Sequence, residues 1–291
     1  MSLTSILFRL GASKGDRARD RRIPYPTGVN QICNLSYGPH GKSNLLDVYW
    51  PEAKECCPVI VSVHGGGYVY GDKEVYKRYC MDLARRGFTV INFNYRLAPR
   101  WKFPAPLEDL HNVMFWLHQK SRDYHADPSR IFLVGDSAGA QIVSQYAAMA
   151  TNPDYMALFH FPALDSDIRI RAVGLNCGMY DMAPIAAQQR TGIHLDYLGR
   201  KLPKNDPRFA VMENITGHFP PAHITTSCHD FLRENAEPMA QFLRSKGVES
   251  VCECYGTEED TRIGHVFHVN IILEEAIACN DAQCAFFRQY L

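Results

Sequence analysis

The sequence predicts an α/β fold, in which a mostly parallel central sheet is flanked by helices. The first observation is that short apolar runs alternate along the chain with longer segments whose apolar residues recur at three- and four-residue spacing. Such alternation is typical of strands and helices that form one layered domain. The second is the length of 291 residues, 46% of them hydrophobic, which suffices to bury one large core. We therefore expect a single domain over residues 1–291.

Seven segments are expected to be strands, because each is short, apolar and bounded by polar or turn-forming residues. In chain order they are residues 46–50, 59–63, 89–95, 130–134, 172–176, 223–226 and 251–255. Five amphipathic segments are expected to be helices, namely residues 75–86, 107–120, 138–150, 234–246 and 271–290. Gly87 and Gly247 stand where glycine caps would end two of these helices.

Two segments fit this alternation poorly, residues 1 to about 40 and about 181 to 217, since both are rich in charge, proline or short irregular pieces. Loops beyond the carboxyl ends of parallel strands carry ligand sites, so these segments are expected to form a small cap over that face. Residues 3–10 are interpreted as a short amphipathic arm, and the arginine-rich residues 17–22 as a solvated arm.

The overall charge is balanced, with 31 basic and 31 acidic residues, so no net field favours nucleic acid or acidic lipid. The balance suits an enzyme that acts on a small molecule. Ten cysteines without a CxxC pair predict reduced thiols rather than a disulfide framework or a zinc site. No run is long enough to span a bilayer, and no signal peptide is evident, so a cytoplasmic protein is expected.

The segment 135–139 reads Gly-Asp-Ser-Ala-Gly and lies between a predicted strand and a predicted helix. This context is typical of a nucleophile elbow, in which glycines let the backbone bend sharply and the serine stands exposed at the edge of the sheet. Ser137 is therefore the expected nucleophile. Its neighbour Asp136 is expected to have a structural part, bonding the adjacent loops.

A second glycine-rich turn, His64-Gly65-Gly66-Gly67, directly follows the strand at 59–63. Acyl transfer builds negative charge on the substrate oxygen, and backbone amides fixed near that oxygen stabilise it. Gly66, Gly67 and Ala138 are expected to supply these amides, with His64 and Gly65 supporting the loop. A flexible turn or a phosphate site would be the alternative for three glycines alone, but the GxxxxGK[ST] pattern is missing.

These motifs resemble the HGGG and GDSAG motifs of the hormone-sensitive-lipase-like family of α/β-hydrolase carboxylesterases. Residues 95–99, which read YRLAP, and the following residues 103–109 are similar to a third stretch of that family. The resemblance extends from about residue 45 to residue 270. It implies the α/β-hydrolase fold and a carboxylic ester hydrolase that needs no cofactor.

The resemblance also indicates the acid of the site, which in this fold follows the serine along the chain. Residues 230–234, DFLRE, are similar to the family's DPLRD loop, with phenylalanine in place of the proline. Asp230 is therefore the expected acid. Glu234 is expected instead to begin the next helix, where its charge is favourable.

The base is expected last in chain order. Residues 264–267, GHVF, resemble the family's HGF loop, with valine at the usual glycine. This makes His265 the expected base, and His268 remains the alternative because the conformation of the loop cannot be seen in the sequence. No metal site is expected, since the histidines at 218, 223 and 229 have no metal-ligand pattern.

Together these residues predict a two-step acyl transfer in which Ser137 attacks an ester, His265 takes its proton and Asp230 stabilises the imidazolium. Short-chain acyl esters are favoured over triglycerides, because nothing in the sequence points to a broad lipid-binding surface. An amidase or peptidase with the same three residues is the nearest alternative, and a non-catalytic ligand-binding protein is the alternative from another class. A homo-oligomer is compatible with the sequence.

Overall fold

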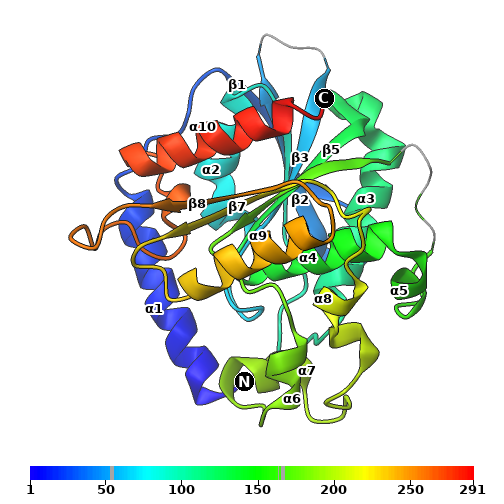
Figure 1. The fold of residues 1–291 in the computed structure, drawn as a ribbon. Helices are drawn as coiled ribbons and strands as arrows, with labels where there is room; N and C mark the ends of the chain where they lie inside the picture. Colours follow the sequence, from blue (N-terminus) through cyan, green and yellow to red (C-terminus); the bar gives the residue numbers. More distant parts are fainter. Residues whose placement is uncertain (53–55, 163, 165–167) are drawn as a thin grey trace.

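The computed structural model describes residues 1–52, 56–162, 164 and 168–291. Its centre is an eight-stranded sheet in the order β1-β2-β4-β3-β5-β6-β7-β8 (Figure 1). β2 pairs antiparallel with β1 and β4, and all other neighbours are parallel. The strands are β1 (Val29–Ser36), β2 (Leu45–Pro51), β3 (Cys57–Val63), β4 (Thr89–Phe93), β5 (Ala126–Asp136), β6 (Ile170–Asn176), β7 (Ala222–Ser227) and β8 (Ser250–Tyr255). The predicted, mostly parallel sheet is thus confirmed.

The central strands are mostly apolar because helices cover both of their faces. Every residue of β3 is buried, and β5 is buried over its last six residues. All seven predicted strands are present. The edge strand β1 was not predicted, because most of its side chains are exposed and only half of its residues are apolar. It lies inside the segment 1–40, so only the part before it can lie over the ligand-binding edge.

Helices lie on both faces of the sheet (Figure 1). α2 and α10 pack on one face, while α3, α4 and α9 pack on the other. The helices are α1 (Leu3–Asp20), α2 (Lys73–Arg85), α3 (Ala105–Lys120), α4 (Ala138–Thr151), α5 (Pro153–Ala157), α6 (Ala183–Ala187), α7 (Gly192–Leu198), α8 (Val211–Asn214), α9 (Ala236–Ser245) and α10 (Glu274–Arg288). Among the described residues, no helix is both long and apolar enough to cross a membrane.

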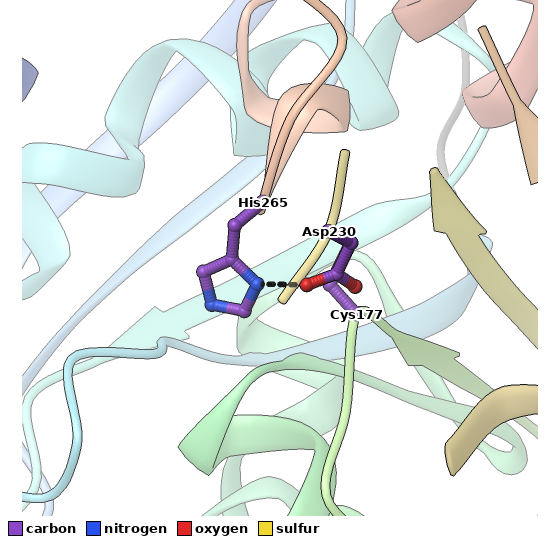
Figure 2. Close-up of side chains that lie close together, drawn as sticks. All are labelled: Cys177, Asp230 and His265. Carbon is purple, nitrogen blue, oxygen red and sulfur yellow. Dashed lines mark hydrogen bonds and ion pairs between the residues drawn. The ribbon is translucent and has the colours of Figure 1, made fainter. Parts of the chain in front are cut away.

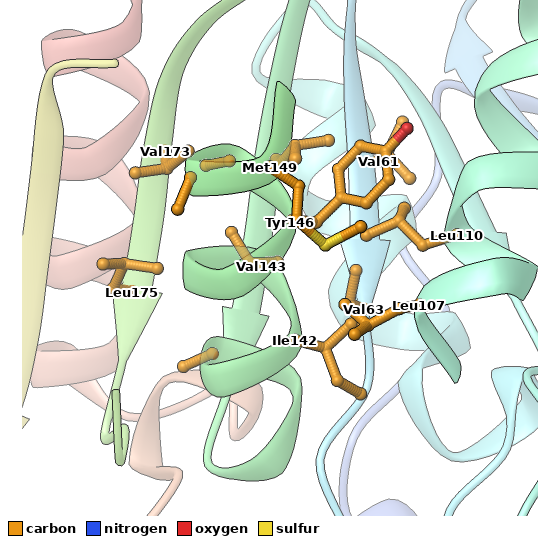
Figure 3. Packing of buried hydrophobic residues seen from close by; sticks show 14 of the residues in the cluster. Val61, Val63, Leu107, Leu110, Ile142, Val143, Tyr146, Met149, Val173 and Leu175 are labelled. Carbon is orange, nitrogen blue, oxygen red and sulfur yellow. The ribbon is translucent and has the colours of Figure 1, made fainter. Parts of the chain in front are cut away.

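α4 is fixed by one large buried cluster, part of which Figure 3 shows. Ile142 and Tyr146 of α4 belong to this cluster together with Val63 of β3 and Leu107 of α3, and all four are fully or almost fully buried. Burying one such side chain contributes about 2 kcal/mol. The packing therefore holds the start of α4 firmly against the end of β5.

The N-terminal segment is not the short arm that the sequence predicted. α1 has eighteen residues and is capped by Ser2, whose hydroxyl accepts a hydrogen bond from the Ser5 amide. The backbone amide and the hydroxyl of Ser2 both donate to Asp196 of α7, at 2.8 and 2.9 Å. These bonds tie the start of α1 to the second irregular segment, residues 181–217.

The arginine-rich residues 17–22 are likewise not a solvated arm throughout. The first four of them continue α1, and the Arg19 side chain donates to Asp16, to Asp20 and to the Val75 carbonyl. Arg17 is exposed, as expected. The interpretation failed for Arg19 because a helix turns successive side chains in different directions, so that one arginine of the run faces the body of the protein.

Candidate active site

Ser137 lies on the turn between β5 and α4, with φ +53° and ψ −118°. Few residues other than glycine adopt a positive φ, and such strain persists only where the surroundings enforce it. The Ser137 amide donates to the Asn176 carbonyl at 3.0 Å, which fixes the turn against β6. The turn places Ser137 in the wall of a cavity at the carboxyl edge of the sheet.

The two glycines of the elbow allow the turn to pack tightly. A methyl group at Gly135 would lie 2.3 Å from the Gly139 carbonyl oxygen, and one at Gly139 would lie 2.1 Å from the Val63 carbonyl oxygen. Both contacts are with backbone atoms, which cannot swing away as a side chain can. The spacing of the motif therefore follows from the close approach of α4 to β5 and β3.

The Gly139→Ala variant is expected to lower the free energy of unfolding by about 3 kcal/mol, because its methyl group would force the backbone apart. Gly11→Ala is the matched control, since Gly11 lies in α1 and a methyl group there would meet nothing within 4 Å. The control should be neutral or slightly stabilising. Urea unfolding of both variants measures the difference, and equal stabilities would contradict the packing argument.

The glycine loop that follows β3 is bent back on itself. Gly66 and Gly67 have φ values of +110° and +58°, and the Gly66 carbonyl accepts the amides of Val69 and Tyr70. A methyl group at Gly66 would lie 2.2 Å from the Tyr70 carbonyl oxygen. The loop therefore needs glycine at position 66 both for its backbone conformation and for space.

His64 supports this loop from beneath. Its buried Nδ1–H donates to the Gly65 carbonyl at 2.7 Å, and its ring stacks on Tyr95 at 4.1 Å. Burial lowers the pKa of His64 to about 4, so the ring is neutral at neutral pH. The Tyr95 hydroxyl donates to the His64 carbonyl at 2.9 Å. The tyrosine that opens the YRLAP segment thus holds the glycine loop in place.

Asp136 joins the two turns. The Tyr76 hydroxyl donates to Asp136 at 2.7 Å and accepts the Gly65 amide at 3.0 Å. Burial raises the pKa of Asp136 to about 7, although the bond from Tyr76 acts in the opposite direction. Asp136 therefore connects the elbow to the glycine loop through one tyrosine.

Asp230 and His265 meet beside this pair of turns. Asp230 Oδ1 lies 2.6 Å from His265 Nδ1 (Figure 2). The carboxylate also accepts the Thr226 hydroxyl and the Leu232 amide, each at 2.9 Å. Burial alone would raise the pKa of Asp230, but these hydrogen bonds and the nearby His265 hold the pKa below its usual value. Asp230 is therefore a carboxylate at neutral pH and orients the imidazole.

His268, the alternative base, lies elsewhere. It is fully buried, packs edge-on against Tyr79 with ring centres 5.2 Å apart, and finds no hydrogen-bond partner for either nitrogen within the described part of the chain. Burial lowers the pKa of His268 to about 3. The structure thus brings His265, and not His268, to Asp230.

The pKa of His268 predicts a pH-dependent contribution to stability. Below pH 6.5 the unfolded chain binds a proton on this side chain that the folded protein does not, so stability falls as the pH drops. The His268→Phe variant, which keeps a ring against Tyr79, is expected to lose this dependence. As the pH is lowered from 8 to 5, the wild type should lose about 2 kcal/mol in free energy of unfolding that the variant keeps. Urea unfolding at both values tests this, and a pH-independent difference would disprove it.

Cys177 is a neighbour of this pair that the sequence reasoning missed (Figure 2). Cys177, Asp230 and His265 each offer one atom that could bind a metal ion, and these three atoms lie within 4.8 Å of one another. However, a thiol binds metal as a thiolate, and burial next to Asp230 raises the pKa of Cys177 well above its usual value. The Cys177 sulfur instead accepts the Val266 amide at 3.4 Å, which supports the histidine loop.

A cavity of about 650 Å³ connects these elements, a size common for small-molecule sites. Gly66, Gly67, Ser137, Ala138 and His265 all line it. One wall is α1, which contributes Phe8, Ala12, Gly15, Asp16 and Arg19, and another comprises Ile193 and His194 of α7. Phe231, which replaces the proline of the family's acid loop, is 74% exposed and packs against the His265 ring at 4.2 Å.

Comparisons with known proteins agree with this geometry. Residues 60–268 match the family described as alpha/beta hydrolase fold. The chain is also 30% identical over 265 residues to Esterase LipI of Mycobacterium tuberculosis (strain ATCC 25618 / H37Rv), a match that covers 84% of this chain and 81% of the relative. The chain belongs to the hormone-sensitive-lipase-like family of α/β-hydrolases. The predicted family, fold and carboxylic ester hydrolase class are thereby confirmed.

Further relatives of this α/β-hydrolase are named for the same chemistry. Carboxylesterase NlhH of the same Mycobacterium strain is 28% identical over 252 residues, covering 80% of this hydrolase and 76% of the relative. Ethyl acetate hydrolase of Pseudomonas putida is 28% identical over 196 residues, a match that covers 65% of this hydrolase and 61% of the relative. Esterase B of Lactobacillus rhamnosis has the same fold, with a TM-score of 0.88 at 21% identity over 97% of this chain and 93% of its own.

Proposed function

We propose that this α/β-hydrolase is a serine carboxylesterase that hydrolyses small, short-chain acyl esters through an acyl-enzyme. One observation carries the proposal: Ser137 and the Asp230-bound His265 line one cavity together with the amide-bearing residues Gly66, Gly67 and Ala138. A nucleophile, an oriented base and amides near a developing negative charge are the parts that acyl transfer needs.

In the first step the Ser137 hydroxyl attacks the ester carbonyl carbon while His265 Nε2 takes its proton. Asp230 holds the hydrogen on Nδ1, which leaves Nε2 free to accept, and stabilises the imidazolium that forms. The imidazolium then protonates the leaving alcohol. In the second step His265 takes a proton from water, which attacks the carbonyl carbon of the acyl-enzyme. The bond from that carbon to Ser137 Oγ then breaks, the imidazolium returns the proton to Oγ, and the acid is released.

The oxyanion of each tetrahedral intermediate would be bound by the amides of Gly66, Gly67 and Ala138. Ala138 is the first residue of α4, so its amide also adds the positive end of the helix dipole. The Gly65 amide already donates to Tyr76 and so is not assigned to the oxyanion. Each fixed donor of this kind is worth about 3 kcal/mol in the transition state.

The preference for short acyl groups rests on the cap, which we propose consists of α1 and the segment around α7. A methyl group at Gly67 would lie 3.4 Å from Ile193 and 3.5 Å from Phe8, so both helices close on the glycine loop. We propose that these two helices narrow the cavity beside the proposed oxyanion site and so disfavour a long acyl chain there. The name of the Pseudomonas relative, an ethyl acetate hydrolase, also supports small esters.

A p-nitrophenyl ester series from acetate to long-chain acyl tests this function. We expect kcat/KM to be highest for short acyl groups and to fall at least about tenfold by decanoate, because added methylenes meet the cap. An alkyl p-nitrophenyl phosphonate should label the Ser137 peptide, as measured by mass spectrometry. Faster turnover of the matched p-nitroanilides would indicate an amidase. Folded protein without turnover or labelling would indicate a ligand-binding protein.

A further inference from the structure

α1 has two distinct faces. The inner face lines the cavity through Phe8, Ala12, Gly15, Asp16 and Arg19, which recur at helical spacing. It is held by the bonds of Ser2 to Asp196 and by the bond of the Tyr70 hydroxyl to Asp16, at 2.8 Å. The helix is therefore fixed on the body of the protein, and its other face is turned away from the cavity, at the edge of the molecule (Figure 1).

The outer face of the first half of α1 is apolar. Leu3, Ile6, Leu7 and Leu10 are 70%, 43%, 60% and 65% exposed, and their spacing of three and four residues puts them on one side of the helix. Single exposed leucines are ordinary on protein surfaces, but a row of four on one helix face marks an interaction site.

Towards the C-terminal end of α1, the same side of the helix carries basic residues. Lys14, Arg17 and Arg21 follow Leu10 at alternating four- and three-residue spacing, and all three are exposed. Within the described ranges no carboxylate pairs with them, whereas both acids of the helix, Asp16 and Asp20, are bound by Arg19. The outer face is thus apolar at one end and carries uncompensated positive charge at the other.

We propose that this outer face of α1 docks the protein on an anionic lipid surface, with the leucines inserted among the acyl chains and the basic residues against the headgroups. Apolar residues beside lysine and arginine on one exposed helix face are characteristic of helices that lie in a membrane interface. The overall charge of the chain is zero, so the attraction comes from this local stripe and not from the whole protein.

A second copy of the chain fits the same face poorly. If two copies paired through this stripe with the helices parallel, the basic ends would face each other. If the helices were antiparallel over their full length, the leucines of each would face the lysine and arginines of the other. An anionic bilayer complements both halves at once, because it offers negative headgroups above an apolar layer.

Sedimentation of the full chain with vesicles tests the proposal. We expect binding to vesicles of equal parts phosphatidylcholine and phosphatidylglycerol, weaker binding to phosphatidylcholine alone, and release by salt. The triple variants Leu3→Ser/Leu7→Ser/Leu10→Ser and Lys14→Glu/Arg17→Glu/Arg21→Glu should each weaken binding at least about tenfold. Ile277→Ser is the matched control, because Ile277 is 41% exposed on α10 and should not contribute.

Binding is measured without an ester, so its outcome is independent of the proposed esterase activity. Both triple variants should hydrolyse soluble p-nitrophenyl acetate like the wild type, since the changed residues do not line the cavity. The glutamate variant keeps good helix formers, so it tests the charges even if the serine variant unfolds. The proposal would be overturned if the wild type did not bind anionic vesicles, or if the glutamate variant bound them as well as the wild type. It would also be overturned if the wild type were a dimer and the serine variant became monomeric without losing vesicle binding.

Discussion

Replacing Ser137 by alanine is expected to lower kcat for p-nitrophenyl acetate by a factor on the order of 10⁵ to 10⁶. The substitution removes the Oγ nucleophile and little else. The Ser137 side chain makes no capping hydrogen bond to α4, and alanine is no more strained than serine at φ +53°. The free energy of unfolding should therefore stay within about 0.5 kcal/mol of the wild type.

Steady-state hydrolysis together with urea unfolding measures both parts of this expectation. The His268→Phe variant serves as the comparison, because it changes a buried residue near the site while leaving the proposed nucleophile, acid and base intact. Full activity in Ser137→Ala protein, with its identity checked by mass spectrometry, would show that the hydrolysis comes from another residue or from a contaminant.

Asp230→Asn is expected to reduce kcat on the order of 10⁴-fold. An asparagine amide can donate to His265 Nδ1, which would move the imidazole hydrogen to Nε2. His265 could then no longer accept the serine proton. Glu234→Gln is the matched control, since Glu234 is an exposed carboxylate four residues further along the same loop and should change kcat less than twofold by this argument. Equal losses in the two variants would contradict the assignment of Asp230.

The pKa of Asp230 adds a pH dependence to this result. Because the pKa lies below its usual value, the carboxylate is fully ionised from about pH 5 upward, and its contribution is lost only as the pH falls through the lowered pKa. The Asp230 carboxyl group, followed by carbon-13 NMR of the wild type with Asp230→Asn for assignment, should therefore complete its titration below pH 5. An Asp230 carboxyl signal that still titrates between pH 6 and pH 8 would contradict the lowered pKa.

The parts of the site that lie on short glycine-rich turns could be predicted because their chemistry is local. The elbow at Ser137 and the loop at Gly66 need glycine at particular positions for space and backbone conformation, so the requirement is written directly in the sequence. Asp230 and His265 carry no such local signal. They were predicted from chain order and family resemblance, and only the fold brings them within 2.6 Å.

The missed features depend on tertiary contacts. α1 escaped prediction because Phe8 is the only large apolar residue among those of its inner face that line the cavity, while most of its large apolar side chains point outward, which reverses the usual pattern. Cys177 follows a strand as an isolated cysteine, and its place beside Asp230 results from the pairing of β6 with β7. The one available signal was its position at the carboxyl end of a predicted central strand.

The bond from Tyr76 to Asp136 and the bond from Gly65 to Tyr76 make two distant parts of the chain dependent on a single phenol. Neither position 76 nor position 136 can change alone without leaving a buried polar group unsatisfied. The two side chains are therefore structurally dependent on each other. Replacing both would in turn leave the Gly65 amide without its acceptor, so descendants of this chain should keep the tyrosine and the carboxylate together, even though neither residue is assigned a step in the proposed chemistry.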